Sequence, residues 1–369
     1  MLLNFLPPII STSVVAPSIT DQPDTIEVYE GQTATFTVAG SGGGLAYQWQ
    51  KSDNAGVDWS DISGATSSSY TTAATVRTTD NDDQFRCVVT NLAGTVNSNA
   101  ATLTVWSPAA LTGLQLWLDA SDASTVLEGA ADPAEANDPV SQWSDKSGNV
   151  RDATQGTLAA RPVYRSAAQN GRNVLEWDGT DDFLSVGAVA TFKHLHDGTA
   201  SLVCIVARPG LVANPNAIYA FIDNCGVSSG SIGYSLAYDD RASVPRNNVL
   251  LEQVSKGSLG NPSISNLSGD AWTPNVFSII DDCMDADNAT ASQRSKVRIN
   301  NGTEIANNAL TNTPSASNAT AVLRLGSSST GTFFLAGQIA EVIICNNQNA
   351  SLLTKLRGYL AWKWGITIA

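Results

Sequence analysis

The chain has 369 residues and a formal net charge of -14, so its length is sufficient for two or three domains. Its 20 basic residues against 34 acidic ones exclude a nucleic-acid footprint and argue against membrane insertion or an anionic membrane surface. Serine, threonine, asparagine and glycine separate short β-branched runs, which predicts an all-β protein with many loops.

Residues 1–16 form an apolar stretch, MLLNFLPPIISTSVVA, without a basic residue. A secretory signal needs a positively charged start and an unbroken apolar middle, and a membrane span needs roughly 20 apolar residues. Pro7 and Pro8 interrupt the run and favour an extended backbone. We therefore expect an extended docking arm that packs on a partner subunit through Leu2, Leu3, Phe5, Leu6, Ile9 and Ile10.

Residues 17–105 alternate between short strands and turn signals, which predicts a β-sandwich. Three stretches, YQWQK, DNDDQFRCVVTN and SNAATLTV, make this region resemble an immunoglobulin-like domain of bacterial and phage surface proteins. The resemblance implies that Val38 stands where the first cysteine of such a domain would lie. Cys87 then lacks a disulfide partner, and Trp49 packs on Val38 and Cys87 in the core. We expect residues 80–83 to form a solvated turn rather than a calcium loop.

The five cysteines are an odd number at wide spacing, which does not suit a disulfide framework or a zinc site. We expect them to be small buried side chains of a protein matured in a reducing cytoplasm, with one disulfide as the alternative. They are Cys87, Cys204, Cys225, Cys283 and Cys345.

Residues 106–111 read as a linker, and a second domain is expected over residues 112–369. Its stretches LQLWLDASDASTV, VSQWSDKSGNVRDATQ, NVLEWDGTDDFLSVG and FFLAGQIAEVIICN resemble laminin G-like, concanavalin A-like jelly-roll domains. In LQLWLDA the leucines alternate with Gln115, Trp117 and Asp119, as expected for a strand with one buried face. We expect Trp117 to cover a sheet edge.

A C-terminal helix is predicted in LLTKLRGYLAWKWG, because its apolar residues fall on one stripe at helical spacing. Gly365 is expected to end this helix, which caps the sandwich, while Trp362 and Trp364 anchor the chain end. The stripe consists of Leu352, Leu353, Leu356, Tyr359 and Leu360.

Two carboxylates in LEWDGTDD, Glu176 and Asp178, are two residues apart on a predicted strand and resemble the acid pair of a glycosidase. The resemblance to laminin G-like domains implies a structural turn instead, with aspartate side chains bonded to the turn backbone. Catalysis by this pair is kept as the alternative, and we expect no enzymatic activity.

The two histidines, His194 and His196, lack a third ligand for zinc and are expected to be exposed loop residues. No cofactor is expected, and calcium is kept as an alternative to solvated acidic loops. The calcium candidates are Asp281, Asp282, Asp285 and Asp287.

Two β-sandwich domains and an apolar arm favour a phage virion surface protein, made in the host cytoplasm. We expect capsid decoration or a head fibre, docked by the arm and displaying the jelly roll. Its expected partners are capsid or tail proteins, further copies of itself as a homo-oligomer, and host surface glycans. The alternatives are a tail receptor-binding protein, a secreted bacterial adhesin, and a glycan-active enzyme using Glu176 and Asp178.

Overall fold

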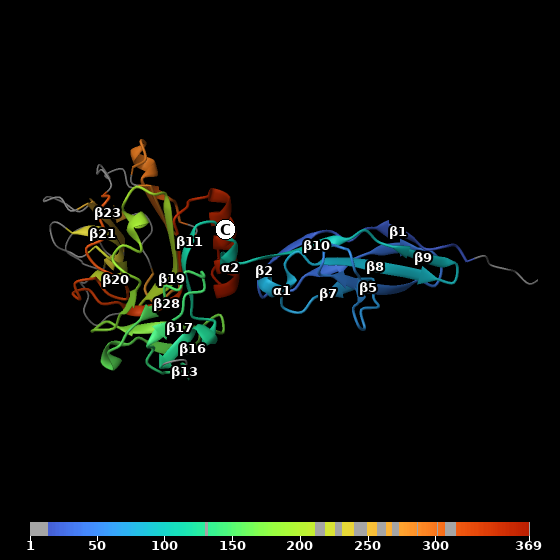
Figure 1. The fold of residues 1–369 in the computed structure, drawn as a ribbon, viewed down its shortest axis with the longest axis horizontal. Helices are drawn as coiled ribbons and strands as arrows, with labels where there is room; N and C mark the ends of the chain where they lie inside the picture. The colour runs from blue at the N-terminus through green and yellow to red at the C-terminus, as the bar shows by residue number, and fades with distance from the viewer. Residues whose placement is uncertain are drawn as a thin grey trace, which may run out of the picture. The chain divides into compact units, whose positions relative to one another are not determined.

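The computed structural model divides into two compact units, Met1–Ser107 and Pro108–Ala369 (Figure 1). It describes residues 14–129, 132–210, 218–225, 231–239, 249–256, 263–267, 273–285, 287–300, 302–306 and 315–368. The apolar side chains predicted for the docking arm lie outside these ranges. Among the described residues, neither unit has a helix of the length and hydropathy that crossing a membrane requires.

The first unit is an immunoglobulin-like β-sandwich, as its strand pattern predicts. One layer has the strand order β2-β10-β8-β5-β6, with β9 paired to β8, and the other contains the pairs β1–β4 and β3–β7. Strand β10 runs parallel to β2 and antiparallel to β8. The strands are β1 (Ser18–Asp21), β2 (Ile26–Tyr29), β3 (Thr35–Thr37), β4 (Ala39–Ser41), β5 (Ala46–Ser52), β6 (Ser60–Asp61), β7 (Ser69–Thr71), β8 (Gln84–Asn91), β9 (Gly94–Asn97) and β10 (Ala101–Trp106).

The core of this unit is apolar and aromatic. Trp49 and Cys87 are fully buried, Val38 belongs to the same cluster, and Cys87 is a free thiol. Trp49 and Cys87 are register partners on β5 and β8, so their side chains share the inner face of one layer. The Trp49 indole N–H donates to the carbonyl of Ser67 at 3.0 Å, which satisfies its one polar atom.

A single helical turn, α1 (Arg77–Asp80), precedes β8, and the apolar pattern does not predict it. The turn is held by a local polar contact, because the Asp80 carboxylate accepts a hydrogen bond from the backbone N–H of Val76 at 2.7 Å. The expectation of a solvated turn at residues 80–83 is wrong for Asp83, which is 2% exposed. Its carboxylate pairs with the Lys51 ammonium, a partner 32 residues earlier in the chain that local patterns do not reveal.

The second unit contains two large sheets over its described residues. One has the order β16-β17-β28-β19-β24-β25-β26, with β11 also paired to β28; the other has the order β13-β12-β14-β15-β18-β27-β20-β21-β22-β23. The strands of the first are β11 (Leu114–Asp119), β16 (Val163–Gln169), β17 (Arg172–Asp178), β19 (Ser201–Pro209), β24 (Ser278–Met284), β25 (Ser295–Ile299), β26 (Ile305–Ala306) and β28 (Ala336–Cys345). Those of the second are β12 (Val126–Gly129), β13 (Asp132–Pro133), β14 (Gln142–Trp143), β15 (Ala153–Thr154), β18 (Leu184–Val186), β20 (Ile218–Asp223), β21 (Ile232–Asp239), β22 (Val249–Lys256), β23 (Ser263–Leu267) and β27 (Leu323–Leu325).

An apolar cluster of the described residues fills the space between these sheets, and Leu116 and Leu118 of β11 belong to it. Trp117, on the opposite face of β11, is also buried, and its indole N–H donates to Glu341 at 2.8 Å. Trp117 was expected to cover a sheet edge; in the structure its side chain is buried and forms a hydrogen bond with Glu341. Gly326 is fixed by close packing, because a Cβ at this position would lie 2.0 Å from Nε1 of Trp177.

The predicted C-terminal helix is confirmed as α2 (Ala350–Trp364), which lies beside the sheet that contains β11, β19 and β28 (Figure 1). Asn349 caps its first turn by accepting from the backbone N–H groups of Ser351 and Leu352. Gly365 ends the helix in the left-handed conformation, with φ of 64°. Leu356, Leu360 and Trp364 are fully buried, so one stripe of α2 packs on the sandwich.

Candidate functional site

Glu176 lies near the end of β17, and both of its carboxylate oxygens are engaged. Arg165 donates to Oε1 through Nε at 3.0 Å and through Nη2 at 2.8 Å, and Gln338 Nε2 donates to Oε2 at 2.5 Å. Partial burial would raise the pKa of Glu176, but the hydrogen bonds from Arg165 and Gln338 lower this pKa. A general acid needs the opposite shift, so this environment suits a structural carboxylate.

Asp178 and Asp182 build the tight turn that follows β17. The Asp178 carboxylate accepts from the backbone N–H of Thr180 at 2.7 Å, and the Asp178 backbone N–H donates to the Asp182 carboxylate at 3.0 Å. Gly179 between them has φ of 81°, a conformation that glycine adopts readily. The aspartates therefore bond to the backbone of their own turn, as the resemblance implies.

Three carboxylates of this turn, those of Asp178, Asp181 and Asp182, each offer an oxygen within 4.8 Å of the others. Such a set of oxygen ligands suits a hard cation such as Ca²⁺. Asp182 is buried whereas Asp178 and Asp181 are exposed. Burial, together with repulsion from Asp178 and Asp181, raises the pKa of Asp182 to about 7.

The four aspartates predicted as calcium candidates are not brought together. Asp281 and Asp282 are neighbours on β24, so their side chains point to opposite faces of the sheet. Asp281 pairs with Arg298 and Arg357, whereas Asp282 accepts a hydrogen bond from the Tyr234 hydroxyl at 2.7 Å. Asp285 and Asp287 follow the strand, and Asp287 is exposed. Because neighbouring residues of a strand point to opposite faces, Asp281 and Asp282 lie in different environments. The spacing of the aspartates in the sequence does not reveal this separation.

His196 is buried and His194 is half-buried rather than exposed, which corrects the sequence-based expectation. His194 Nδ1 lies 3.0 Å from the Ser201 hydroxyl, and His196 Nε2 lies 3.1 Å from the Ser317 carbonyl. Burial lowers the pKa of His194 to about 4. The chain here forms a 3-10 turn (Lys193–Leu195) rather than a strand, so the two rings do not share a sheet face.

A buried charged cluster between α2 and the sheet is the feature that sequence reasoning missed. Lys363 Nζ lies 2.7 Å from Asp119 Oδ1 and 2.9 Å from Glu341 Oε2. Glu341 also accepts from the indole N–H groups of Trp117, at 2.8 Å, and Trp364, at 2.7 Å. These five side chains come from β11, β28 and α2, and together they join the helix to the sheet.

Two lysines, Lys363 and Lys146, offset the three carboxylates of Asp119, Asp122 and Glu341. Burial would raise the pKa of Asp119, but the positive charges of Lys363 and Lys146 hold this pKa well below its ordinary range. Lys146 also lies 2.8 Å from Asp122 and sits over the Trp117 ring at 4.5 Å. Asp119, Glu341 and Lys363 are buried and paired with one another, whereas Lys146 and Asp122 lie at the partly exposed rim, which indicates a structural role.

Among the comparisons with known proteins, the family match falls within the first unit. Residues 19–107 match a family described as a domain of unknown function (DUF8696). A stretch of 91 residues is 42% identical to endoglucanase C of Cellulomonas fimi, covering 24% of this chain and 8% of that enzyme. The chain therefore spans only a small part of this relative.

Solved structures similar to the chain contain immunoglobulin-like domains. A chimeric titin Z1Z2 functionalised with a decorin peptide is 27% identical, with a TM-score of 0.20, over 26% of this chain and 97% of that one. Titin M4 is 22% identical, with a TM-score of 0.20, over 26% and 100% respectively. The IG1+IG2 fragment of DIP-gamma is 18% identical, with a TM-score of 0.20, over 26% and 50%.

Proposed function

We propose that the protein is a non-catalytic binding and display protein of a phage virion surface, most simply a capsid decoration or head-fibre protein. The observation that carries the non-catalytic part is the engagement of Glu176 and Asp178. Arg165 and Gln338 hold Glu176, and Asp178 bonds its own turn, so neither carboxyl is prepared for acid–base chemistry.

In this proposal the second unit is a laminin G-like jelly roll that is displayed for binding, including binding of host glycans. Its two sheets, their shared apolar core and the C-terminal helix support that assignment. The apolar segment 1–16 and the acidic, all-β character of the chain support the proposed virion location. A tail receptor-binding protein and a secreted adhesin are the related alternatives.

Attachment is assigned to residues 1–16. Burying apolar side chains such as Leu3 or Phe5 on a partner would contribute about 1.5–3 kcal/mol each, before the entropy of ordering the arm is subtracted. Deleting residues 1–16 should leave the two units folded but abolish binding to the particle. Imaging of purified virions with an antibody against the second unit measures this, and unchanged occupancy after the deletion would refute the assignment.

The second candidate function is a glycan-active enzyme that uses Glu176 and Asp178. The identity to part of endoglucanase C favours a glycan-related role, although the matched stretch is 8% of that enzyme. Sugar release from polysaccharides by the wild type, lost in Glu176→Gln, would establish this candidate and overturn the first. We expect no release by either protein.

A further inference from the structure

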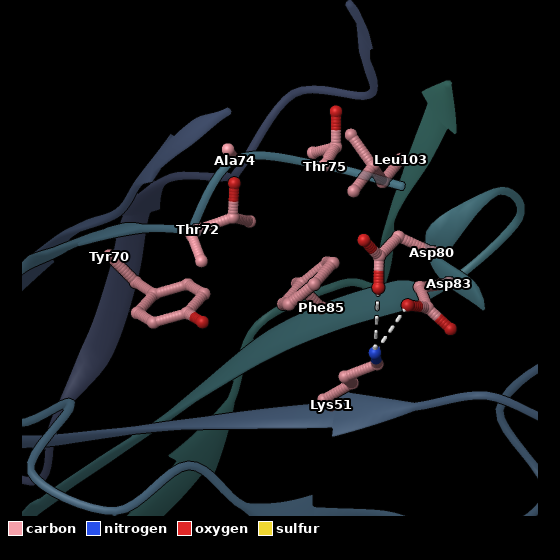
Figure 2. Close-up of a pocket in the computed structure, with 10 residues that line it drawn as sticks. Lys51, Tyr70, Thr72, Ala74, Thr75, Asp80, Asp83, Phe85 and Leu103 are labelled. Atoms are coloured by element: carbon pink, nitrogen blue, oxygen red, sulfur yellow. Dashed lines mark ion pairs between the residues drawn. The ribbon is translucent and has the colours of Figure 1, made fainter. Parts of the chain in front are cut away.

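A cavity of about 140 Å³ opens between the two layers of the immunoglobulin-like unit (Figure 2). Its walls come from β5, β7, β8 and β10, from Asp80 of α1 and Asp83 beyond it, and from the segment of residues 72–75 that follows β7. An enclosed space of about 150 Å³ accommodates one benzene-sized ring. The cavity therefore has room for a single six-membered ring.

One side of the cavity is aromatic and rigid. The rings of Tyr70 and Phe85 are stacked with centroids 5.7 Å apart, and Phe36 backs Phe85 at 4.6 Å. Phe85 is only 2% exposed, so its position is fixed by the core. The Tyr70 hydroxyl faces Phe85 and Lys51 in Figure 2, and no described residue forms a hydrogen bond with it. This hydroxyl can both donate and accept.

The other side of the cavity is an ion pair that is anchored in the core but reachable from solvent. Lys51 Nζ lies 2.5 Å from Asp83 Oδ2 and 3.7 Å from Asp80 Oδ1. The Asp83 side chain is 3% exposed, whereas those of Lys51 and Asp80 are 37% and 27% exposed. Asp80 is also fixed through its bond to the Val76 backbone N–H. The polar groups are therefore positioned before any ligand arrives.

This arrangement selects for a neutral polar ligand. A cation would compete with Lys51 for the two carboxylates, and an anion would face Asp80 and Asp83. A hydroxyl group, in contrast, can accept from the Lys51 ammonium and donate to a carboxylate without leaving any charge unpaired. A ring with hydroxyls at its edge and C–H groups on its face would meet both sides of the cavity.

We propose that this cavity binds one pyranose unit of a glycan, with the sugar face on Tyr70 and its hydroxyls on Tyr70, Lys51 and Asp80. Few directed polar groups beside an aromatic wall are typical of small-ligand sites. The proposal does not rest on the virion role or on the second unit, because every group that it uses belongs to the first unit.

The test is saturation-transfer NMR on the full chain with glucose, galactose, mannose and N-acetylglucosamine as separate probes. At least one sugar should bind, and Tyr70→Phe should weaken that binding about fivefold, the effect of one lost hydrogen bond. Lys51→Met should weaken it by at least as much. Tyr47→Phe is the matched control, because Tyr47 packs on the same core but does not line the cavity, and it should leave binding unchanged.

Thermal unfolding of each variant separates lost binding from lost folding, which matters for Lys51→Met because it leaves Asp83 without its cation. Tyr70→Phe removes only a hydroxyl that bonds no described residue, so it should not disturb folding. This variant therefore tests binding alone. The proposal is overturned if no sugar binds at tens of millimolar, or if Tyr70→Phe and Tyr47→Phe bind equally. Preferential binding of benzene or butylammonium would also overturn it, because these probes report a purely apolar or a cation site.

Discussion

The two units bury their key side chains in opposite ways. The immunoglobulin-like unit centres on Trp49, Val38 and Cys87, an apolar contact without a disulfide. The second unit places Asp119, Glu341 and Lys363 between α2 and its sheet, and all three are less than 5% exposed. Losing part of an apolar contact has a graded cost, whereas removing one buried charge leaves its partners unpaired. The second unit should therefore be the more sensitive of the two to single substitutions.

The largest effect is expected for Lys363→Met, which keeps most of the side-chain volume but removes the cation shared by Asp119 and Glu341. We expect the free energy of unfolding of the second unit to fall by about 3–5 kcal/mol, as for other broken buried pairs. Urea unfolding followed by tryptophan fluorescence measures this fall, because Trp117 and Trp364 bond to the same carboxylate.

Thr354→Ala, on the exposed side of α2, is the control for helix effects and should change stability by less than about 0.5 kcal/mol. Adding Glu341→Gln to Lys363→Met should recover part of the loss, because one of the two stranded carboxylates is then neutral. If the free energy of unfolding of Lys363→Met fell by less than about 1 kcal/mol, the buried charged cluster would be no more sensitive to substitution than the apolar core.

Asp182 contrasts with Asp119 within the second unit, because its carboxyl is buried but pairs with no cationic side chain among the described residues. Its pKa is raised to about 7 by burial and by Asp178 and Asp181, whereas lysines lower that of Asp119. A raised carboxyl pKa contributes stability that is fully present below the ordinary value of 3.8 and is lost as the pH rises through about 7. At about 1.4 kcal/mol per pKa unit, the loss reaches at most about 4 kcal/mol.

The test is Asp182→Asn, which keeps an acceptor for the Asp178 backbone N–H but cannot ionise. The variant should gain stability relative to the wild type as the pH rises from about 4 to about 7, with no further gain above it. Urea unfolding at several pH values gives the difference directly. A difference that is independent of pH would mean that Asp182 titrates near its ordinary value.

Asp178→Ala tests the exposed part of the same turn. The substitution removes the acceptor for the Thr180 backbone N–H. We expect a loss of about 1–3 kcal/mol in the free energy of unfolding, since the turn loses a charge-assisted hydrogen bond. Asp181→Ala is the matched control, because Asp181 is exposed and bonds no described backbone group. Equal losses in both variants would point to a general charge effect rather than to the turn.

The sequence predicted the periodic features and missed the contacts that join distant segments. Strand alternation indicated the all-β architecture, and the stripe of Leu353, Leu356 and Leu360 indicated α2. Nothing in the sequence pairs Lys363 with Asp119, because 244 positions separate them and their contact exists only after β11 and α2 meet. The cavity beside Tyr70 was missed for the same reason, since its groups come from four strands, the α1 turn and the loops that follow β7 and α1.

The prediction that four aspartates form a calcium site does not hold, for a different physical reason. Proximity in sequence places carboxylates close together in a loop, but on a strand it sends neighbours to opposite faces. Asp281 therefore meets Arg357 of α2, whereas Asp282 meets Tyr234 in the interior. The turn at Asp178 was predicted correctly because its contacts are local and its glycine is diagnostic.

The smallest effect is expected at Cys87, where only apolar contact is lost. Its thiol is fully buried beside Trp49, and burial raises its pKa to about 11. Cys87→Ala removes one heavy atom, so the free energy of unfolding should fall by about 1 kcal/mol, the value for one buried methylene-sized group.

The buried thiol of the wild type should react with a maleimide only after the first unit unfolds, because the thiolate is the nucleophile. Cys87→Ser is the control, since it keeps the size but buries a hydroxyl and should be less stable than the alanine variant. Mass mapping of labelled peptides measures the reaction at Cys87 alone. Rapid labelling in the native state, or a disulfide to any of the other cysteines, would contradict an apolar core closed without a covalent bridge.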